Sequence, residues 1–314
     1  ITILWLVVTG IVGCTPASTM PSSRQEVGLA QLALPQNVRL ALDVALSPAR
    51  SKVAFVGYLG NKTRNGDLDT LDIASGAMTT TAPSDTYYSI SNPQWSPDGT
   101  SISFTAVSGP QNKDGIFVVR SNSDPVYVAS GYEATWSPDG SKLAVLDSVH
   151  GNSQIKIVDL QDGTARTIFV PQTGSREYIS SLDWSPSAQS LAFTMSSEQN
   201  RQRVGRLYRI DQDGSNLKVL VADPGGRSAT SPKWILDEKW LAFLRSDGLD
   251  QTLNFVRSDG QCIVSPLTKL NTIMSMDISR DGTTAILELD NGLYQLDLAA
   301  TLKPQFLNTM LVCN

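Results

Sequence analysis

Side chains that could carry out acid–base or metal chemistry are scarce in this sequence. The 314 residues contain one histidine, His150, so a catalytic triad or a histidine-rich metal site would depend on that imidazole alone. His150 lies in the polar segment 147–153, which is typical of an exposed loop. The sequence also lacks the G-x-S-x-G motif of α/β-hydrolases. These features disfavour a hydrolase.

Two clusters of carboxylates carry the oxygen ligands that calcium prefers, one at residues 67–72 and one at residues 211–214. Neither cluster has the twelve-residue loop with a terminal glutamate. Asp72 and Asp211 stand where turns are expected, and Asp67 and Asp69 alternate along an expected strand. We therefore expect no metal and no cofactor, with calcium as the alternative.

The net charge excludes one class of partner. The 25 Lys and Arg residues are outnumbered by 30 Asp and Glu residues, which gives a formal charge of −5. Nucleic-acid binding depends on basic groups that displace counterions. We therefore expect no nucleic-acid partner.

The first thirteen residues, ITILWLVVTGIVG, are mostly apolar and uncharged. They are fewer than the ~20 that a spanning helix needs, which is typical of the hydrophobic part of a signal peptide. The sequence Ile11-Val12-Gly13-Cys14 resembles the lipobox of bacterial lipoproteins. The resemblance implies a lipid on Cys14, attachment to a membrane through that lipid, and a place in the bacterial cell envelope. The alternative is a buried N-terminal strand with an incidental cysteine.

This interpretation divides the chain into a signal peptide at 1–13, a flexible tether at 14–35 and a folded domain at 36–314. The tether mixes Ser, Thr, Pro, Gln and Ala without a strict period, so it cannot bury a core. Because the sequence starts without Met, we expect its true N-terminus to lie upstream. Two cysteines then remain, Cys262 and Cys313, and they either form a disulfide or are two separately buried thiols.

A repeat organises the chain from residue 36 onward. Its anchor positions are separated by 41 to 50 residues, a period that suits one four-stranded propeller blade. The six copies are Ala45-Leu46-Ser47-Pro48, Trp95-Ser96-Pro97-Asp98-Gly99, Trp136-Ser137-Pro138-Asp139-Gly140, Trp184-Ser185-Pro186, Trp234-Ile235-Leu236-Asp237 and Ile278-Ser279-Arg280-Asp281-Gly282.

Short apolar runs flank each copy, and no helical period is sustained. The Ser-Pro-Asp-Gly residues suit a tight hairpin, because Pro presets φ, Asp accepts from backbone N–H groups and Gly adopts the left-handed conformation. The tryptophans that precede the turns are expected to pack between neighbouring blades rather than to bind a ligand. They are Trp95, Trp136, Trp184 and Trp234.

The segment from Pro93 to Phe104, with its P-x-W-S-P-D-G turn, resembles the TolB-type WD40-like (PD40) propeller repeat. The resemblance implies an all-β fold, a six-bladed β-propeller with four antiparallel strands per blade. TolB itself has an α/β domain ahead of its propeller, where this chain has the tether. The partners of TolB are therefore not carried over.

Aromatic and basic residues are expected in the loops on the propeller face opposite the Ser-Pro-Asp-Gly turns. Tyrosine and arginine are enriched at binding surfaces, which favours a ligand-binding rim on that face. The alternative is a set of ordinary polar loops. The predicted rim consists of Tyr87, Tyr88, Tyr132, Tyr178, Arg176 and Arg227.

These observations favour an envelope-anchored binding module for a protein or peptide, without catalytic residues. Two alternatives stay open: a propeller enzyme that acts on an extracellular polysaccharide, as a lyase or glycosidase, and a structural subunit of an envelope complex. The single histidine argues against lyases that use histidine-rich metal sites.

The lipid anchor can be tested at Cys14. Replacing Cys14 by Ala removes the thiol that would be acylated, so we expect an uncleaved precursor or loss of the protein from the membrane fraction. Fractionation and intact mass measure both. A processed, membrane-bound C14A protein would contradict the lipoprotein interpretation.

Overall fold

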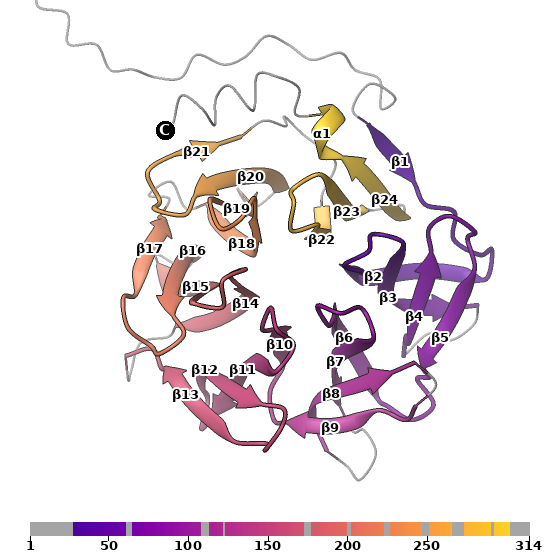
Figure 1. Cartoon of the computed structure of the whole chain (residues 1–314), viewed down its shortest axis with the longest axis horizontal. Helices are drawn as coiled ribbons and strands as arrows, with labels where there is room; N and C mark the ends of the chain where they lie inside the picture. Colours follow the sequence, from indigo (N-terminus) through magenta and orange to yellow (C-terminus); the bar gives the residue numbers. More distant parts are fainter. Residues whose placement is uncertain are drawn as a thin grey trace, which may run out of the picture.

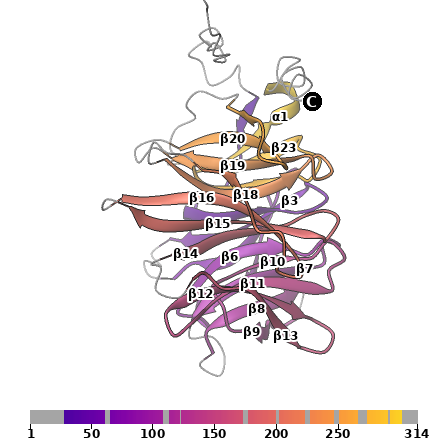
Figure 2. The ribbon, with the colours of Figure 1, turned by 90° about the vertical axis from the view of Figure 1, so that its left-hand side faces the viewer.

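The structure is a computed structural model that describes residues 28–60, 65–107, 113–121, 123–172, 177–199, 202–222, 227–246, 251–265, 273–289 and 292–301. These residues form six four-stranded antiparallel sheets arranged as blades around a central axis (Figure 1). The predicted six-bladed β-propeller is confirmed. The strands run across the thickness of the disc from one face to the other (Figure 2).

The first three blades, in chain order, consist of β2 (Val38–Leu46), β3 (Lys52–Leu59), β4 (Asp67–Asp72) and β5 (Met78–Ala82); β6 (Ser89–Trp95), β7 (Ser101–Val107), β8 (Gly115–Arg120) and β9 (Val126–Ala129); and β10 (Glu133–Trp136), β11 (Lys142–Val149), β12 (Asn152–Asp159) and β13 (Ala165–Phe169). Blades 4 and 5 consist of β14 (Tyr178–Trp184), β15 (Ser190–Gln199), β16 (Gln202–Asp211) and β17 (Lys218–Val221); and β18 (Ser228–Ile235), β19 (Trp240–Ser246), β20 (Gln251–Arg257) and β21 (Ile263–Val264).

Blade 6 is built from both ends of the described chain. It contains β22 (Ile273–Ile278), β23 (Thr284–Leu289) and β24 (Gly292–Asp297), followed by the short helix α1 (Leu298–Thr301). Its fourth strand is β1 (Leu29–Gln31), which pairs antiparallel with β24 and so closes the ring (Figure 1).

The position of β1 corrects the predicted boundary between tether and propeller. The predicted tether at 14–35 includes β1, so the propeller starts before residue 36. The three residues of β1 are too few to show an alternating pattern. Only their pairing with β24 makes them a strand.

The hydrophobic core lies between neighbouring blades. Val56 and Leu68 of blade 1, for example, are buried in one cluster with Phe104 and Phe117 of blade 2. Such clusters form because each sheet is apolar on both faces, so each blade needs a neighbour on either side.

The predicted turn chemistry is present in blades 2 and 3. Asp98 accepts a hydrogen bond from Ser96 Oγ (2.6 Å) and another from the backbone N–H of Thr100 (3.0 Å), while Gly99 has a φ of 69°. In blade 3, the hydrogen bonds from Ser137 and Ser141 lower the pKa of Asp139 to about 2. These carboxylates are therefore committed to holding the turns.

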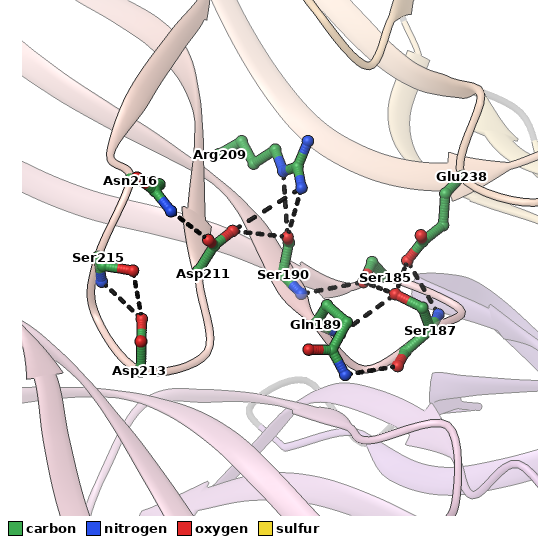
Figure 3. A network of polar contacts seen from close by, with 10 residues as sticks. All are labelled: Ser185, Ser187, Gln189, Ser190, Arg209, Asp211, Asp213, Ser215, Asn216 and Glu238. Atoms are coloured by element: carbon green, nitrogen blue, oxygen red, sulfur yellow. Dashed lines mark hydrogen bonds and ion pairs between the residues drawn. The ribbon is translucent and has the colours of Figure 1, made fainter.

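Blades 4 and 5 lack the Ser-Pro-Asp-Gly residues, and their turns are joined to each other (Figure 3). In blade 4, Ser187 stands in the Asp position and its Oγ accepts from Gln189 N (3.3 Å), while Glu238 of blade 5 accepts from Ser187 N (2.9 Å) and Ser187 Oγ (2.5 Å). Glu238 belongs to a run of three left-handed residues, with φ of 52° at Leu236, 52° at Asp237 and 67° at Glu238. This costly conformation holds the blade 5 turn against that of blade 4.

The four tryptophans pack between blades as predicted. Trp184 and Trp234 are 0% and 1% exposed. Trp95 of blade 2 donates through Nε1 to Ala45 O of blade 1 (3.2 Å), and Trp136 of blade 3 donates to Gln94 O of blade 2 (3.1 Å). Each indole therefore joins two blades.

Truncating one of these tryptophans should destabilise the whole propeller. We expect Trp184→Ala to lower the free energy of unfolding by about 3 to 5 kcal/mol, because a fully buried aromatic leaves a cavity. Urea unfolding measures the change. Trp95→Ala, at a partly exposed indole, is the matched control and should cost less. A loss below ~1 kcal/mol for Trp184→Ala would contradict the role of this residue.

Candidate functional site

The structure separates the residues of the predicted rim. Tyr87 is 3% exposed, and its ring contacts Phe104 and Phe117 edge-on at 5.7 Å and 5.6 Å. Its side chain therefore belongs to the core, because it fills the space between blades 1 and 2. The neighbouring Tyr88 is 69% exposed. Arg227 is also exposed, and Arg176 lies outside the described residues.

Two of the predicted rim tyrosines come together. Tyr132 of blade 3 and Tyr178 of blade 4 are stacked with 5.6 Å between ring centroids, and Tyr178 is 39% exposed. Burial raises the pKa of Tyr132, whose hydroxyl donates to Ile179 O (2.9 Å). This pair therefore also holds blades 3 and 4 together.

The remaining candidate residues are dispersed. His150 is exposed in the turn between β11 and β12, away from the Ser-Pro-Asp-Gly face. Cys262 is disulfide-bonded. Cys14 and Cys313 lie outside the described residues, so the pairing of Cys262 with Cys313 stays a prediction.

A cavity lies where the sequence did not predict a site. It has a volume of about 470 Å³ and is bordered by the turns themselves, at the mouth of the central channel. Blades 2 to 6 each contribute to its lining the residue directly before the Trp-Ser-Pro motif or its equivalent. We call the residues at this repeat position the upper ring: Ala45, Gln94, Thr135, Asp183, Lys233 and Asp277, of which Ala45 is buried in the core and does not line the cavity.

The upper ring has a neutral half on blades 1 to 3 and a charged half on blades 4 to 6. Lys233 Nζ lies 3.0 Å from Asp277 Oδ1 and donates across the channel to Gln94 Oε1 of blade 2 (3.4 Å). Burial alone would lower the pKa of Lys233, but the carboxylates of Asp277 and Asp183 outweigh it and raise that pKa. Lys233 is therefore a fixed cation rather than a base.

Arg280 completes the charged half from the turn of blade 6. Its Nη1 and Nη2 donate to the two oxygens of Asp183 of blade 4, at 2.7 Å and 3.1 Å. Asp183 is 3% exposed at its side chain and also accepts from Trp234 N of blade 5 (2.6 Å). One carboxylate thus ties three blades together.

A second ring lies two residues earlier in each blade, around a smaller cavity of about 100 Å³. We call these residues the inner ring: Asp43, Asn92, Glu133, Ser181, Ser231 and Ser275. Four of them have left-handed φ of 51° to 55°, where a bulge interrupts the first strand. Both cavities touch Gln94 and Lys233, so the Lys233–Gln94 bond lies between them.

Carboxylates satisfy the backbone N–H groups at these bulges. Glu133 accepts from Ser181 N (3.1 Å) and Leu182 N (2.8 Å) of the next blade. Glu288 accepts from Asp43 N (3.1 Å), and Asp43 in turn accepts from Asn92 N (3.2 Å). Burial raises the pKa of all three of these carboxyl groups.

The two rings were missed from the sequence although a signal for them exists. The residues occupy fixed positions in the repeat, one and three positions before the first residue of the turn motif. Aligning the six copies would have shown a polar or charged residue at those positions in nearly every blade. The cavity also lies on the turn face, whereas the predicted rim lies on the opposite face.

The carboxylates considered for calcium have structural partners. Asp67 and Asp69 are 3% and 0% exposed in β4, where Asp67 accepts from Ser84 N (2.6 Å) and Asp69 from Thr80 Oγ1 (2.7 Å). Within the part of the chain that the structure describes, no group of three or more His, Cys, Asp or Glu could hold a metal ion. Nor does any helix of that part have the length and apolar character to cross a membrane.

Comparison with known proteins agrees with this geometry. A family model described as TolB beta propeller domain matches residues 27–274. TolB from Acinetobacter baumannii is similar with a TM-score of 0.57 and 18% identity, over 70% of this chain and 52% of that one. The chain therefore spans about half the length of that TolB.

Solved structures with other activities are similar as well. An oligogalacturonate lyase from Vibrio parahaemolyticus has a TM-score of 0.60 and 15% identity, covering 89% of this chain and 81% of its own. A puromycin-hydrolyzing peptidase from Mycobacterium tuberculosis has a TM-score of 0.53 and 18% identity, covering 80% of this chain and 42% of its own. At these identities the likeness shows the fold alone.

The raised pKa values predict how stability depends on pH. A group whose pKa is raised on folding contributes most below its ordinary pKa and loses that contribution as the pH rises through the raised value. Glu288→Gln removes one such group and keeps the acceptor for Ser275 Oγ and Asp43 N, since both donate to Oε2. The wild type should lose stability as the pH rises from 4 to 7, and the variant should not. We therefore expect the free energy of unfolding of the variant, relative to that of the wild type, to increase between pH 4 and pH 7.

Urea unfolding at both pH values measures the difference, which converts at about 1.4 kcal/mol per pKa unit. Glu288→Ala is the control. It loses both hydrogen bonds and should be less stable than Glu288→Gln at each pH. If the stability of the Glu288→Gln protein changed with pH in the same way as that of the wild type, a raised pKa of Glu288 in the folded protein would be contradicted.

Proposed function

The chain belongs to the TolB beta propeller domain family, and we propose that it is a binding module for a protein or peptide. We further propose that it is held at the bacterial cell envelope by a lipid on Cys14. The Ile11-Val12-Gly13-Cys14 motif supports the anchor. The cavity at the mouth of the channel supports the binding role, and the rest of the proposal depends on it.

The cavity has the mixed lining that suits a peptide. One side carries apolar groups from the turns of the first three blades, among them Pro48, Pro97 and Pro138. Charged residues stand at the mouth as well, Arg50 in the turn of blade 1 and Arg280 and Asp281 in the turn of blade 6. A concave apolar surface with a few placed polar groups is the usual form of a ligand site.

The walls of the cavity are rigid before any ligand arrives. Trp95 and Trp136 are fixed by hydrogen bonds to the preceding blade, and the turns of blades 2 and 3 are held by their own side-chain hydrogen bonds. A preorganised surface loses little entropy on binding. The fold therefore favours a fixed recognition surface.

The same residues do not suit catalysis. Asp183 and Asp277 are engaged by cations and backbone N–H groups, and Lys233 keeps its charge. Among the described residues that line the cavity there is no histidine or cysteine. This favours binding over the alternative of a polysaccharide lyase or glycosidase, in which a free acid or base is needed.

The proposal can be tested by blocking the cavity. Pro97 is exposed, lines the cavity and sits in a turn position that accepts most residues, so Pro97→Trp should cover the mouth without unfolding the protein. We expect this variant to lose at least tenfold, about 1.4 kcal/mol, in affinity for a partner captured from the native envelope.

The matched control lies on the opposite face. Tyr88→Ala and Tyr178→Ala remove exposed rings of the predicted rim and should leave capture unchanged. Capture that survives Pro97→Trp and fails with the tyrosine variants would place the site on the rim instead. Binding constants from immobilised protein compare the two faces.

A further inference from the structure

We propose that the turn-face cavity takes a peptide segment with a carboxylate next to apolar residues, and that Arg280 and Arg50 bind this carboxylate. The inference rests on the proposed function and adds the chemical class of the ligand. It follows from the hydrogen bonds made by the residues at the mouth of the cavity. Their carboxylate oxygens already have partners within the protein, whereas several of their guanidinium N–H groups do not.

The carboxylates of Asp183 and Asp277 at the mouth already have partners within the protein. Both oxygens of Asp183 accept from Arg280, and one also accepts from Trp234 N. Asp277 accepts from Leu46 N (2.8 Å) and pairs with Lys233. Their side chains are 3% and 12% exposed, which leaves little carboxylate surface for a cation or a hydroxyl donor of a ligand.

Asp281 is saturated in the same way by its own turn. Its Oδ1 accepts from Ser279 Oγ (2.6 Å), Thr283 N (3.1 Å) and Thr283 Oγ1 (2.8 Å), and its Oδ2 accepts from Arg50 (2.6 Å). Although Asp281 is exposed, its carboxylate is therefore committed.

The two guanidinium groups keep unused donors. Each guanidinium has five N–H groups. Arg280 uses its Nη atoms on Asp183 and, weakly, on Trp234 O (3.4 Å), so its Nε and one Nη2 hydrogen have no acceptor among the described residues. Arg50 uses only Nη1, on Asp281 and Thr283 (2.8 Å). Their side chains are 49% and 45% exposed.

Arg50 occupies a position that normally favours glycine. Its φ is 58°, and the equivalent turn positions of blades 2, 3 and 6 hold Gly99, Gly140 and Gly282 with φ of 69°, 71° and 69°. A left-handed conformation costs energy for any residue with a Cβ atom. In blade 1, this unfavourable backbone conformation is adopted by Arg50, whose guanidinium group lies at the mouth of the cavity.

The opposite wall indicates a peptide rather than an acidic sugar. Trp136 is 7% exposed, and Nε1 of both Trp95 and Trp136 is bonded to the preceding blade. Trp136 therefore offers little open ring face for a sugar to stack on, whereas Pro97 and Pro138 offer apolar surface for aliphatic or prolyl side chains. The carboxylates that are already paired within the protein also leave few acceptors for sugar hydroxyls.

The test uses the full folded chain and a randomised library of N-acetylated hexapeptide amides. We expect bound sequences to be enriched in Asp or Glu next to apolar residues. The best binder is then synthesised with its acid and with the matching amide, and binding is followed by the change in intrinsic tryptophan fluorescence, to which Trp95 and Trp136 in the cavity lining contribute.

The expected result is at least a tenfold preference for the acid form, lost in Arg50→Gln and in Arg280→Gln. Arg50→Gln is the safer variant, because Arg50 is half exposed and its partner Asp281 stays solvated. Arg50→Lys, which keeps the charge, should restore part of the preference. Unfolding curves confirm that each variant is folded.

Three other outcomes would contradict the carboxylate inference, the proposed function or both. Peptides that bind the cavity with equal affinity as acid and amide would overturn the carboxylate inference and leave the proposed function standing. A library in which no peptide distinguishes the wild type from Pro97→Trp would overturn the proposed function itself. Binding of trigalacturonate without binding of any selected peptide would replace both with an acidic-sugar site.

Discussion

The free inner edges of six strands meet at the axis of this propeller, and nothing can pair with them as a strand. Their backbone N–H groups would be buried without partners, which is costly. Carboxylates of neighbouring blades fill this role: Glu133 for Ser181 and Leu182, Asp183 for Trp234, and Asp277 for Leu46. Because each of these hydrogen bonds joins two blades, the bonds that satisfy the buried N–H groups also fix the positions of the blades relative to one another.

This arrangement breaks the symmetry of the ring. A repeat of near-identical turns would build a channel that looks the same from every blade. In the upper ring, charge is instead confined to Asp183, Lys233 and Asp277 on blades 4 to 6, while Gln94 and Thr135 face them from blades 2 and 3. The two halves of this ring are therefore chemically different.

The period of the repeat and the chemistry of its turns predicted six blades, their strand pattern and the packing of the tryptophans. These features are local or recur at a fixed distance, so they are visible along the chain. The contacts across the channel are not visible in this way. Glu133 and Ser181 lie in different copies of the repeat, and Arg280 reaches Asp183 past a whole blade.

Neighbouring residues can also differ in environment for reasons that composition does not reveal. Tyr87 and Tyr88 are adjacent, yet one is 3% exposed and the other 69%. The segment before β6 turns Tyr87 toward Phe104 and Phe117, and the following residue then points outward. Counting tyrosines in loops could not separate the two.

Closure of the sixth sheet by β1 has a consequence for the order of synthesis. Leu29 lies opposite Leu296, so β1 is made by the ribosome well before its partner β24, with the other five blades made in between. At ordinary elongation rates that interval is on the order of tens of seconds. Five blades can assemble from consecutive strands during that time, while the ring stays open. Synthesis of the β23–β24 hairpin therefore decides when the propeller of the nascent chain can close.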